Sequence, residues 1–240
     1  MAIGTLWGVS VGPGNPDWMT VEGIRAIQSV GAIACPQDRQ GKPGMAYRIA
    51  QQYVGERPVI SLDLPFVTDA DVLERSWQAA AKQLVPILQQ GSDVAFICEG
   101  DASFFSTFAY LAREVRQQEA GVGVQVLPGV CSPLAAAAAL SIPLSMWDEG
   151  VAIVPAVHRV DELDAILDWA DVVVLMKLSS VFDRVYATLE RRSLLAHTGL
   201  VEWLGWPQQQ AFHSLNNMQD YRPPYFSIAI VRNPLKRFPG

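Results

Sequence analysis

The sequence predicts an α/β protein of two domains. The N-terminal domain is expected to hold a mostly parallel sheet with flanking helices, and the C-terminal domain a smaller mixed sheet with helices. Short apolar runs that alternate with helical patterns predict the β-α-β units of a parallel sheet. Three of these runs lead directly into glycine-containing turns, at residues 12–14, 99–101 and 128–129. Since parallel strands end at the same edge of a sheet, where α/β proteins bind ligands, we expect the three turns to lie close together.

The first turn organises the N-terminal domain. Residues 6–11 form an apolar run typical of a buried strand, and the sequence Gly-Pro-Gly follows at 12–14. Its glycines allow backbone conformations or close approaches that a Cβ would block, while Pro13 fixes one φ angle. Thr20 then caps a helix that extends to residue 31. The motif is neither G-x-G-x-x-G nor a phosphate-binding loop, so these residues alone leave two interpretations: a ligand-binding turn, or a plain connection between strand and helix.

The remaining elements of the N-terminal half follow from the same patterns. The run at 93–98 is apolar throughout, as expected for a strand covered on both faces. A capping box at 68–71 introduces the longest helix, which extends to about residue 90. Ser132 as N-cap and Pro133 as the first helical residue begin a short helix that ends near residue 140. The other strands are expected at 32–36, 58–62 and 122–127, and the other helices at 45–54 and 104–115.

The character of the sequence changes after residue 140, where an irregular connection extends to Gly150. We predict an N-terminal domain over residues 1–130 and a C-terminal domain over residues 131–240. In the second domain, strands are expected at 151–154, 171–176, 199–204 and 226–232, and helices at 160–170 and 180–192.

The composition argues against several classes of protein. Hydrophobic residues make up 50% of the 240 residues and charged residues 18%, which is typical of a globular chain rather than a disordered one. The net charge is -6 and no stretch concentrates Lys or Arg, so we expect no nucleic-acid partner. Cys35, Cys98 and Cys131 are far apart and odd in number, which fits the reducing cytoplasm. The histidines lack metal-ligand spacing, and we expect no metal, no signal peptide and no membrane-spanning segment.

The three turns, taken in order, resemble a known family. Residues 11–20 read VGPGNPDWMT, residues 99–107 read EGDASFFST, and residues 127–132 read LPGVCS. Together with VVVLMK at 172–177 and PYFSIAIV at 224–231, these motifs are similar to those of the tetrapyrrole (corrin and porphyrin) methyltransferases. Each motif alone is weak, but their joint order along nearly the whole chain is specific. Within the family, the chain looks most like the enzymes that methylate carbon 20 of precorrin-2 in cobalamin biosynthesis. The residues that carry this likeness are 106–108 with 110–111, the helix that contains Trp77, and Asp148-Glu149 before residues 151–155.

The resemblance implies transfer of a methyl group from S-adenosylmethionine, which leaves as S-adenosylhomocysteine. It also implies a homodimer whose cofactor lies in a cleft between the two domains of each chain. One departure is Ala102, which stands where the family usually has proline, and this leaves the turn less fixed in φ. The cofactor contacts that the resemblance implies are Pro13, Glu99, Gly100, Asp101, Phe104, Cys131, Ser132, Met176 and Leu204.

Several interpretations stay open from the sequence. Asp101 either helps to bind the cofactor or caps the following helix, and both can hold together. The many carboxylates of a tetrapyrrole need basic partners, for which Arg39, Lys42, Lys177 and Arg184 are candidates, although each also fits a solvated surface charge. No residue is assigned as the proton acceptor. The alternatives to methylation at carbon 20 are methylation of another tetrapyrrole position and a non-catalytic nucleotide-binding module.

Overall fold

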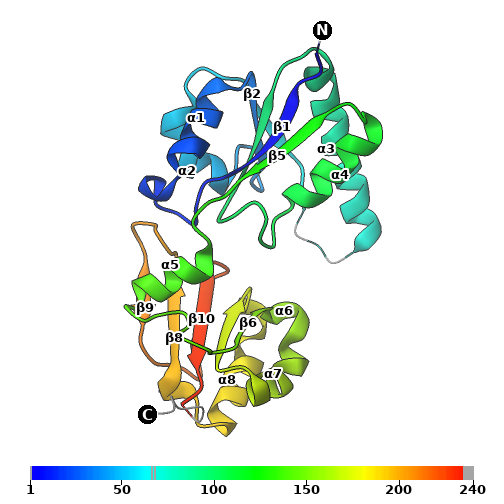
Figure 1. The fold of residues 1–240 in the computed structure, drawn as a ribbon. Helices are drawn as coiled ribbons and strands as arrows, with labels where there is room; N and C mark the ends of the chain where they lie inside the picture. Colours follow the sequence, from blue (N-terminus) through cyan, green and yellow to red (C-terminus); the bar gives the residue numbers. More distant parts are fainter. Residues whose placement is uncertain (1, 66, 68, 235–240) are drawn as a thin grey trace. The chain divides into compact units, whose positions relative to one another are not determined.

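The computed structural model of the chain describes residues 2–65, 67 and 69–234 (Figure 1). The chain folds as two compact units, Met1–Cys131 and Ser132–Gly240. Each unit has one five-stranded sheet and its own hydrophobic core. The predicted class, an α/β protein with one parallel and one mixed sheet, is confirmed.

The first unit is a parallel sheet between two pairs of helices. Its strands are β1 (Thr5–Ser10), β2 (Ala32–Pro36), β3 (Val59–Leu62), β4 (Val94–Cys98) and β5 (Gly123–Leu127), in the order β3-β2-β4-β1-β5, and all pairings are parallel. Its helices are α1 (Val21–Ser29), α2 (Met45–Val54), α3 (Ala70–Gln89) and α4 (Phe108–Gln118), with a short 3-10 helix η1 (Pro16–Trp18). Figure 1 shows α1 and α2 against one face of the sheet and α3 and α4 against the other.

The topology places the three glycine-containing turns on neighbouring strands. β1 is paired with β4 on one side and with β5 on the other, so the turns after these three strands share one edge. All five residues of β4 are buried, as its continuous apolar pattern predicts. Thr20 caps α1, because its Oγ1 accepts a hydrogen bond of 3.1 Å from the Gly23 amide. The expectation that the turns lie together is therefore confirmed.

Helix α4 begins later than predicted. It starts at Phe108, whereas the apolar spacing indicated a start near residue 104. Phe105 has a φ of +49°, a left-handed conformation that cannot continue a right-handed helix. The apolar residues at 104 and 105 therefore belong to a long turn after β4, and this turn forms part of the candidate site.

The cap of the longest helix also differs. α3 is capped by Asp69, whose side chain accepts a hydrogen bond of 3.0 Å from the Val72 amide. Thr68, the first residue of the predicted capping box, lies outside the described residues. Pro86 is accommodated inside the helix.

The second unit is a mixed sheet in the order β6-β7-β10-β8-β9. Its strands are β6 (Val151–Pro155), β7 (Val172–Met176), β8 (Thr198–Glu202), β9 (Gln210–Phe212) and β10 (Ser227–Arg232). β6 is parallel to β7, β10 is antiparallel to both β7 and β8, and β9 is antiparallel to β8. The carboxyl ends of β6, β7 and β8 therefore share one edge with the start of β10.

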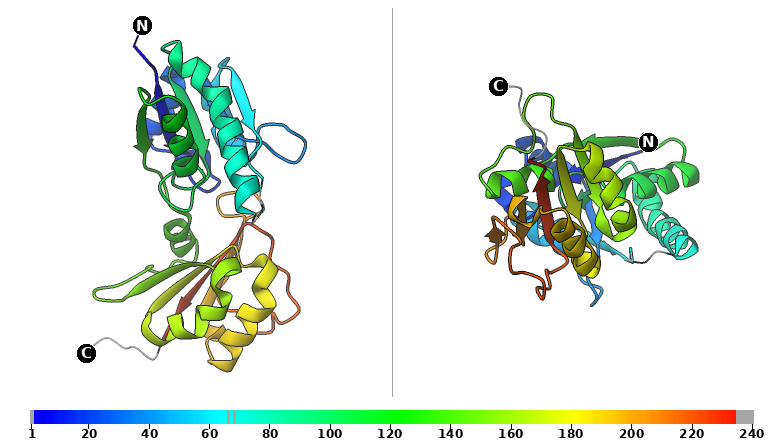
Figure 2. Two further views of the ribbon diagram at one scale, coloured as in Figure 1. Left: turned by 90° about the vertical axis from the view of Figure 1, so that its right-hand side faces the viewer. Right: turned by 90° about the horizontal axis from the view of Figure 1, so that it is seen from below.

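Helices cover the second sheet unequally. They are α5 (Ser132–Ala139), α6 (Ala156–Arg159), α7 (Leu163–Trp169) and α8 (Phe182–Arg191), with 3-10 helices η2 (Val160–Glu162), η3 (Ser179–Val181) and η4 (Leu195–His197). Figure 2 shows α6, α7 and α8 gathered on one side, where the core cluster of this unit lies. The predicted helix at 160–170 is divided between η2 and α7, and α5 begins at Ser132, so Ser132 is its first residue rather than its N-cap. None of the helices in residues 2–65, 67 and 69–234 has the length and apolar character needed to cross a bilayer.

Candidate active site

The turns after β1 and β4 are joined by their glycines. The Gly12 amide donates to the Gly100 carbonyl at 3.1 Å, and the Gly100 amide donates to the Gly12 carbonyl at 2.8 Å. Both residues have left-handed backbones, with φ of +75° and +68°. A side chain in this region costs roughly 1–2 kcal/mol, so glycine is favoured in both turns.

Asp101 joins the turn after β4 to the turn after β5. Its Oδ2 accepts a hydrogen bond of 2.8 Å from the Gly129 amide, and its Oδ1 accepts from the Ser103 amide at 2.8 Å and from the Ser103 hydroxyl. Burial opposes ionisation of Asp101, but these hydrogen bonds outweigh it and hold the pKa of the carboxyl below its usual value. Because α4 begins only at Phe108, the helix-cap interpretation of Asp101 is wrong. The carboxylate instead orders two strand-end turns.

Ser10 is a third connection, which sequence reasoning missed. It ends β1 and is fully buried. Its hydroxyl donates to the Leu127 carbonyl at 2.6 Å and accepts from the Ala102 amide at 2.8 Å. Thus one hydroxyl of β1, the strand between β4 and β5, satisfies backbone groups from both neighbouring turns. Its only sequence signal is a polar residue at the end of an apolar run.

Replacing Ser10 with alanine is expected to lower the free energy of unfolding by about 1–3 kcal/mol, because a buried amide and a buried carbonyl lose their partner. Urea denaturation of both proteins measures this difference. Ser29→Ala is the matched control, since Ser29 is exposed and its hydroxyl donates to the Ala26 carbonyl of its own helix. Equal stability of the Ser10 and Ser29 variants would contradict a bridging role for Ser10.

Ala102 has a specific place in this network. It is buried, and its amide is the group that donates to Ser10. A proline at this position has no N–H and could not make the bond. In this chain the Ser10 hydroxyl therefore restrains the turn at the residue where the family usually has a proline.

The other cofactor contacts expected in the first unit lie at the same sheet edge. Pro13 belongs to the turn after β1, Glu99 is exposed directly after β4, and the Phe104 amide donates to the Asp101 carbonyl at 3.1 Å. Phe104 also packs edge-on against Phe105, at 4.6 Å between ring centroids. Cys131 follows the turn after β5 and is the last residue of the unit.

The residues expected in the second unit separate into two places. Met176 ends β7, and Leu204 is buried just after β8, so both lie at the edge where these strands end. Ser132 instead begins α5. Two non-glycine residues at the strand-end edge, Lys177 and Trp203, have left-handed φ of +55° and +50°. Strained backbone of this kind is concentrated at functional sites, and it could not be foreseen from the sequence.

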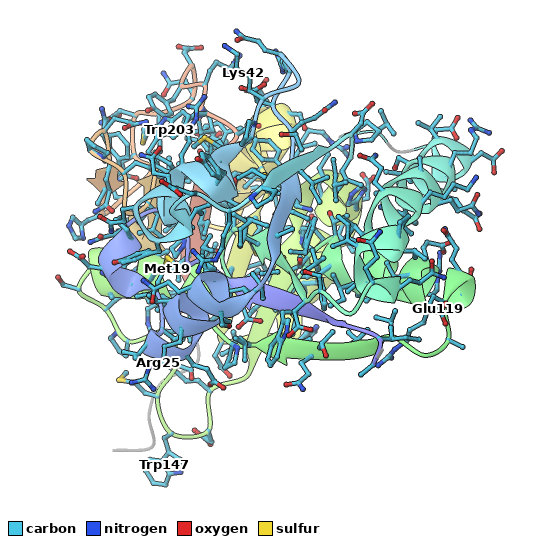
Figure 3. All side chains as sticks on the ribbon, turned by 90° about the horizontal axis from the view of Figure 1, so that it is seen from above. Met19, Arg25, Lys42, Glu119, Trp147 and Trp203 are labelled. Carbon is cyan, nitrogen blue, oxygen red and sulfur yellow. The ribbon has the colours of Figure 1, made fainter. Side chains whose placement is uncertain are left out.

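The candidate substrate-binding residues have different surroundings. Arg39 and Lys42 are exposed on the loop after β2, which a pairing between Gln37 and Pro43 closes, and Figure 3 shows Lys42 on this loop. Lys177 is half-buried at the end of β7. Arg184 forms an exposed ion pair with Asp161, the arrangement expected of a surface charge.

The polar groups at the first edge are the Asp101 carboxylate and the backbone amides and carbonyls of the turns. Within the described ranges, no cluster of three or more His, Cys, Asp or Glu side chains could hold a metal. Asp101 is instead an ionised carboxylate surrounded by backbone amides and carbonyls. A carboxylate has about four acceptor positions, and three are used within the protein, so it can offset the charge of a sulfonium or ammonium group.

Comparisons with known proteins agree with this geometry. A family model described as Tetrapyrrole (Corrin/Porphyrin) Methylases matches residues 5–217. The cobalt-precorrin-2 C(20)-methyltransferase of Salmonella typhimurium is 31% identical over 95% of this chain and 96% of the relative. The probable cobalt-precorrin-2 C(20)-methyltransferase of Methanocaldococcus jannaschii is 28% identical over 95% of each protein.

A solved structure shares the fold. It is the uroporphyrin-III C-methyltransferase of Thermus thermophilus in complex with S-adenyl homocysteine, with a TM-score of 0.67, 17% identity, and coverage of 95% of this chain and 92% of that chain. The family match begins at the first residue of β1 and continues beyond β9, so it includes all of the turns described above. The chain belongs to the tetrapyrrole methylases.

Proposed function

We propose that this protein transfers the methyl group of S-adenosylmethionine to carbon 20 of precorrin-2, in its metal-free or cobalt-bearing form, as a step of cobalamin biosynthesis. The observation that carries the proposal is the ionised Asp101 carboxylate, which holds the turns after β4 and β5 in one arrangement. The relatives named for methylation of carbon 20 match along 95% of the chain at 31% and 28% identity, which supports carbon 20 of precorrin-2 as the position of methylation.

The cofactor contacts are proposed at both sheet edges. Backbone groups at the turns can satisfy the polar atoms of the cofactor at close range, because the glycines bring no side chain between them and a ligand. Asp101 offsets positive charge, and Phe104 offers an apolar ring. The proposed contacts are Pro13, Glu99, Gly100, Asp101, Phe104, Cys131, Ser132, Met176 and Leu204.

Catalysis is proposed to come mainly from positioning. S-adenosylmethionine supplies a methyl group that its sulfonium already activates. The protein must hold the attacking ring carbon in line with the sulfur–methyl bond and exclude water, and such orientation supplies roughly 7–11 kcal/mol in favourable cases. The turns joined by Ser10 and Asp101 provide a rigid support for this task. No side chain is assigned to accept the proton that leaves the ring.

Titration calorimetry combined with turnover tests this proposal. S-adenosylmethionine and S-adenosylhomocysteine should bind, and dinucleotides should not. With labelled cofactor, precorrin-2 or cobalt-precorrin-2 should gain one methyl group, whereas uroporphyrinogen III should gain none. A preference for dinucleotides without methyl transfer would favour the nucleotide-binding module, and methylation of uroporphyrinogen would favour another member of the family.

Removing the basic groups of the loop after β2 is expected to weaken substrate binding. We propose that Arg39 and Lys42 contact substrate carboxylates, so the double variant Arg39→Ala/Lys42→Ala should raise KM for the tetrapyrrole by roughly tenfold, about 1.4 kcal/mol for two exposed charge pairs. Cofactor affinity should be unchanged. Lys82→Ala, which removes an exposed charge on α3, is the control. A KM equal to that of the control would contradict the assignment. Lys177 and Arg184 can be tested in the same assay.

We also propose a cytoplasmic homodimer that has no nucleic-acid or membrane partner. The net charge of -6 disfavours binding to phosphate backbones. Burial raises the pKa of the Cys35 thiol to about 11 and that of the Cys98 thiol to about 12, so both stay protonated and unreactive in a reducing compartment.

A further inference from the structure

One tryptophan of the second unit is almost fully exposed and does not contribute to the core of that unit. Trp147 is 84% exposed, the highest value among the large hydrophobic side chains of the described residues. Met146 beside it is also exposed. Both lie on the segment 143–150, here called the arm, which connects α5 to β6. Figure 3 shows the Trp147 ring at the tip of the arm, pointing outward.

The arm has a defined conformation. The Met146 amide donates to Glu149 Oε2 at 2.7 Å, and the Glu149 amide donates back to the Met146 carbonyl at 3.0 Å. Arg232 at the end of β10 donates to both oxygens of Glu149, at 2.6 and 2.9 Å, and to the Pro143 carbonyl at 2.6 Å. Trp147 itself has a left-handed φ of +48°. The backbone of the arm is therefore ordered before any partner binds, so little backbone entropy is left to lose on binding.

A pocket of about 180 Å³ lies at the base of the arm. Its apolar walls come from Leu140, Ile142, Gly199 and Ile230, and Arg232 contributes to its rim. The pocket is on the sheet face opposite the α6–α8 core, because Gly199 and Ile230 alternate with the core residues Leu200 and Ala229. It is also at the opposite edge from Met176 and Leu204, since Arg232 pairs with Val172 at the start of β7.

The pocket suits one aromatic side chain better than a free ligand. A cavity of ~150 Å³ with apolar walls takes a benzene ring, whereas pockets for drug-sized ligands measure about 300–1,000 Å³. His197 and His213 also line the pocket, and an imidazole nitrogen can accept a hydrogen bond from an indole N–H. Asp148, exposed next to Trp147, can accept a hydrogen bond from the N–H of a neutral imidazole.

We propose that the arm of one chain inserts Trp147 into this pocket of a second copy, and that the second copy reciprocates. The arm and the pocket belong to the same unit, and Arg232 contributes to both. With a two-fold axis beside them, the arm of each copy can enter the pocket of the other, so the same contact is made twice. The inference rests on the proposed homodimer and names its surface. It is independent of methyl transfer, because the pocket and the strand-end edge of this unit lie apart.

Two variants test the two sides of the contact by analytical ultracentrifugation. Trp147→Ala removes the anchor, and Ala196→Trp fills the pocket from an exposed position on its wall. Each should raise the dimer dissociation constant by at least about a hundredfold, since each removes two buried aromatic anchors per dimer. Trp169→Ala, which removes an indole 55% exposed on α7, is the control and should leave the constant unchanged.

Mixing the variants gives a sharper result. A heterodimer of Trp147→Ala and Ala196→Trp chains keeps one intact arm and one intact pocket, so the mixture should dimerise more strongly than either variant alone. A dimer that neither variant weakens would overturn the proposed surface and leave the homodimer standing. A wild-type chain that sediments as a monomer would overturn both. Calorimetry with S-adenosylmethionine, which neither variant should affect, verifies that the variants are folded.

Discussion

Asp101→Ala is expected to weaken S-adenosylmethionine binding by at least about tenfold. The substitution removes three hydrogen bonds to a charged group: one from the Gly129 amide, which ties the turn after β4 to the turn after β5, and two from Ser103 within the turn after β4. Each such bond is worth about 1.5–3 kcal/mol. A tenfold loss of affinity corresponds to about 1.4 kcal/mol of binding free energy, which is less than the worth of one of these bonds. Titration calorimetry with S-adenosylmethionine and S-adenosylhomocysteine measures the change.

Glu119→Ala is the matched control for this experiment. Its carboxylate also accepts side-chain and backbone hydrogen bonds, from Gln89 and Gly121, but before the start of β5, away from the proposed site. These bonds lower the pKa of Glu119, as the bonds to Asp101 lower its pKa. Asp101→Asn keeps the shape of the side chain and removes its charge. Its affinity for S-adenosylmethionine should therefore lie between those of the wild type and Asp101→Ala. If Asp101→Ala is folded and binds the cofactor as tightly as the Glu119 variant, Asp101 does not organise the site.

Gly129→Ala is expected to lower the free energy of unfolding by about 1–3 kcal/mol, the usual penalty of overpacking. An added Cβ would lie 2.4 Å from Ser10 Cβ and 3.2 Å from the Gly100 carbonyl oxygen, both of which are fixed in the network of turns. Relief of this contact must move the turn after β5 away from β1, so cofactor affinity should fall as well. Urea denaturation and calorimetry measure the two effects.

Gly121→Ala provides the comparison at the other end of β5. The added Cβ would lie 2.6 Å from Ile3 Cδ1, the end of a flexible and exposed side chain that can turn away. We therefore expect little change in stability or affinity from this variant. Equal losses in the Gly121 and Gly129 variants would mean that the close approach of Gly129 to Ser10 has no special importance.

Much of the fold could be predicted from the sequence, because its elements are locally consistent. The strands of the first sheet alternate with amphipathic helices, and α2 occurs where its apolar spacing predicts it. β9 could not be predicted, since its residues Gln210–Phe212 carry no strand pattern and pair only with β8. The late start of α4 was hidden by Phe104 and Phe105, whose spacing continues a helical pattern although Phe105 is left-handed.

The candidate site could be predicted in place but not in detail. Glycine turns after adjacent strands identify the edge of a parallel sheet, which is a property of topology. The roles of Ser10 and Asp101 depend on contacts between residues far apart in the sequence, as in the bond from Ser10 to Leu127. The departure at Ala102 also becomes understandable only when its amide is found bonded to Ser10.

The most direct test of the proposed reaction is the position of the transferred methyl group. Precorrin-2 and its cobalt-bearing form would each be incubated with S-adenosylmethionine carrying a ¹³C-labelled methyl group, and the product would be examined by NMR and mass spectrometry. We expect one labelled methyl group, on carbon 20, and its loss in parallel with cofactor affinity in the Asp101→Ala variant. A label on another ring carbon, or cofactor binding without transfer to either form, would contradict the proposed function.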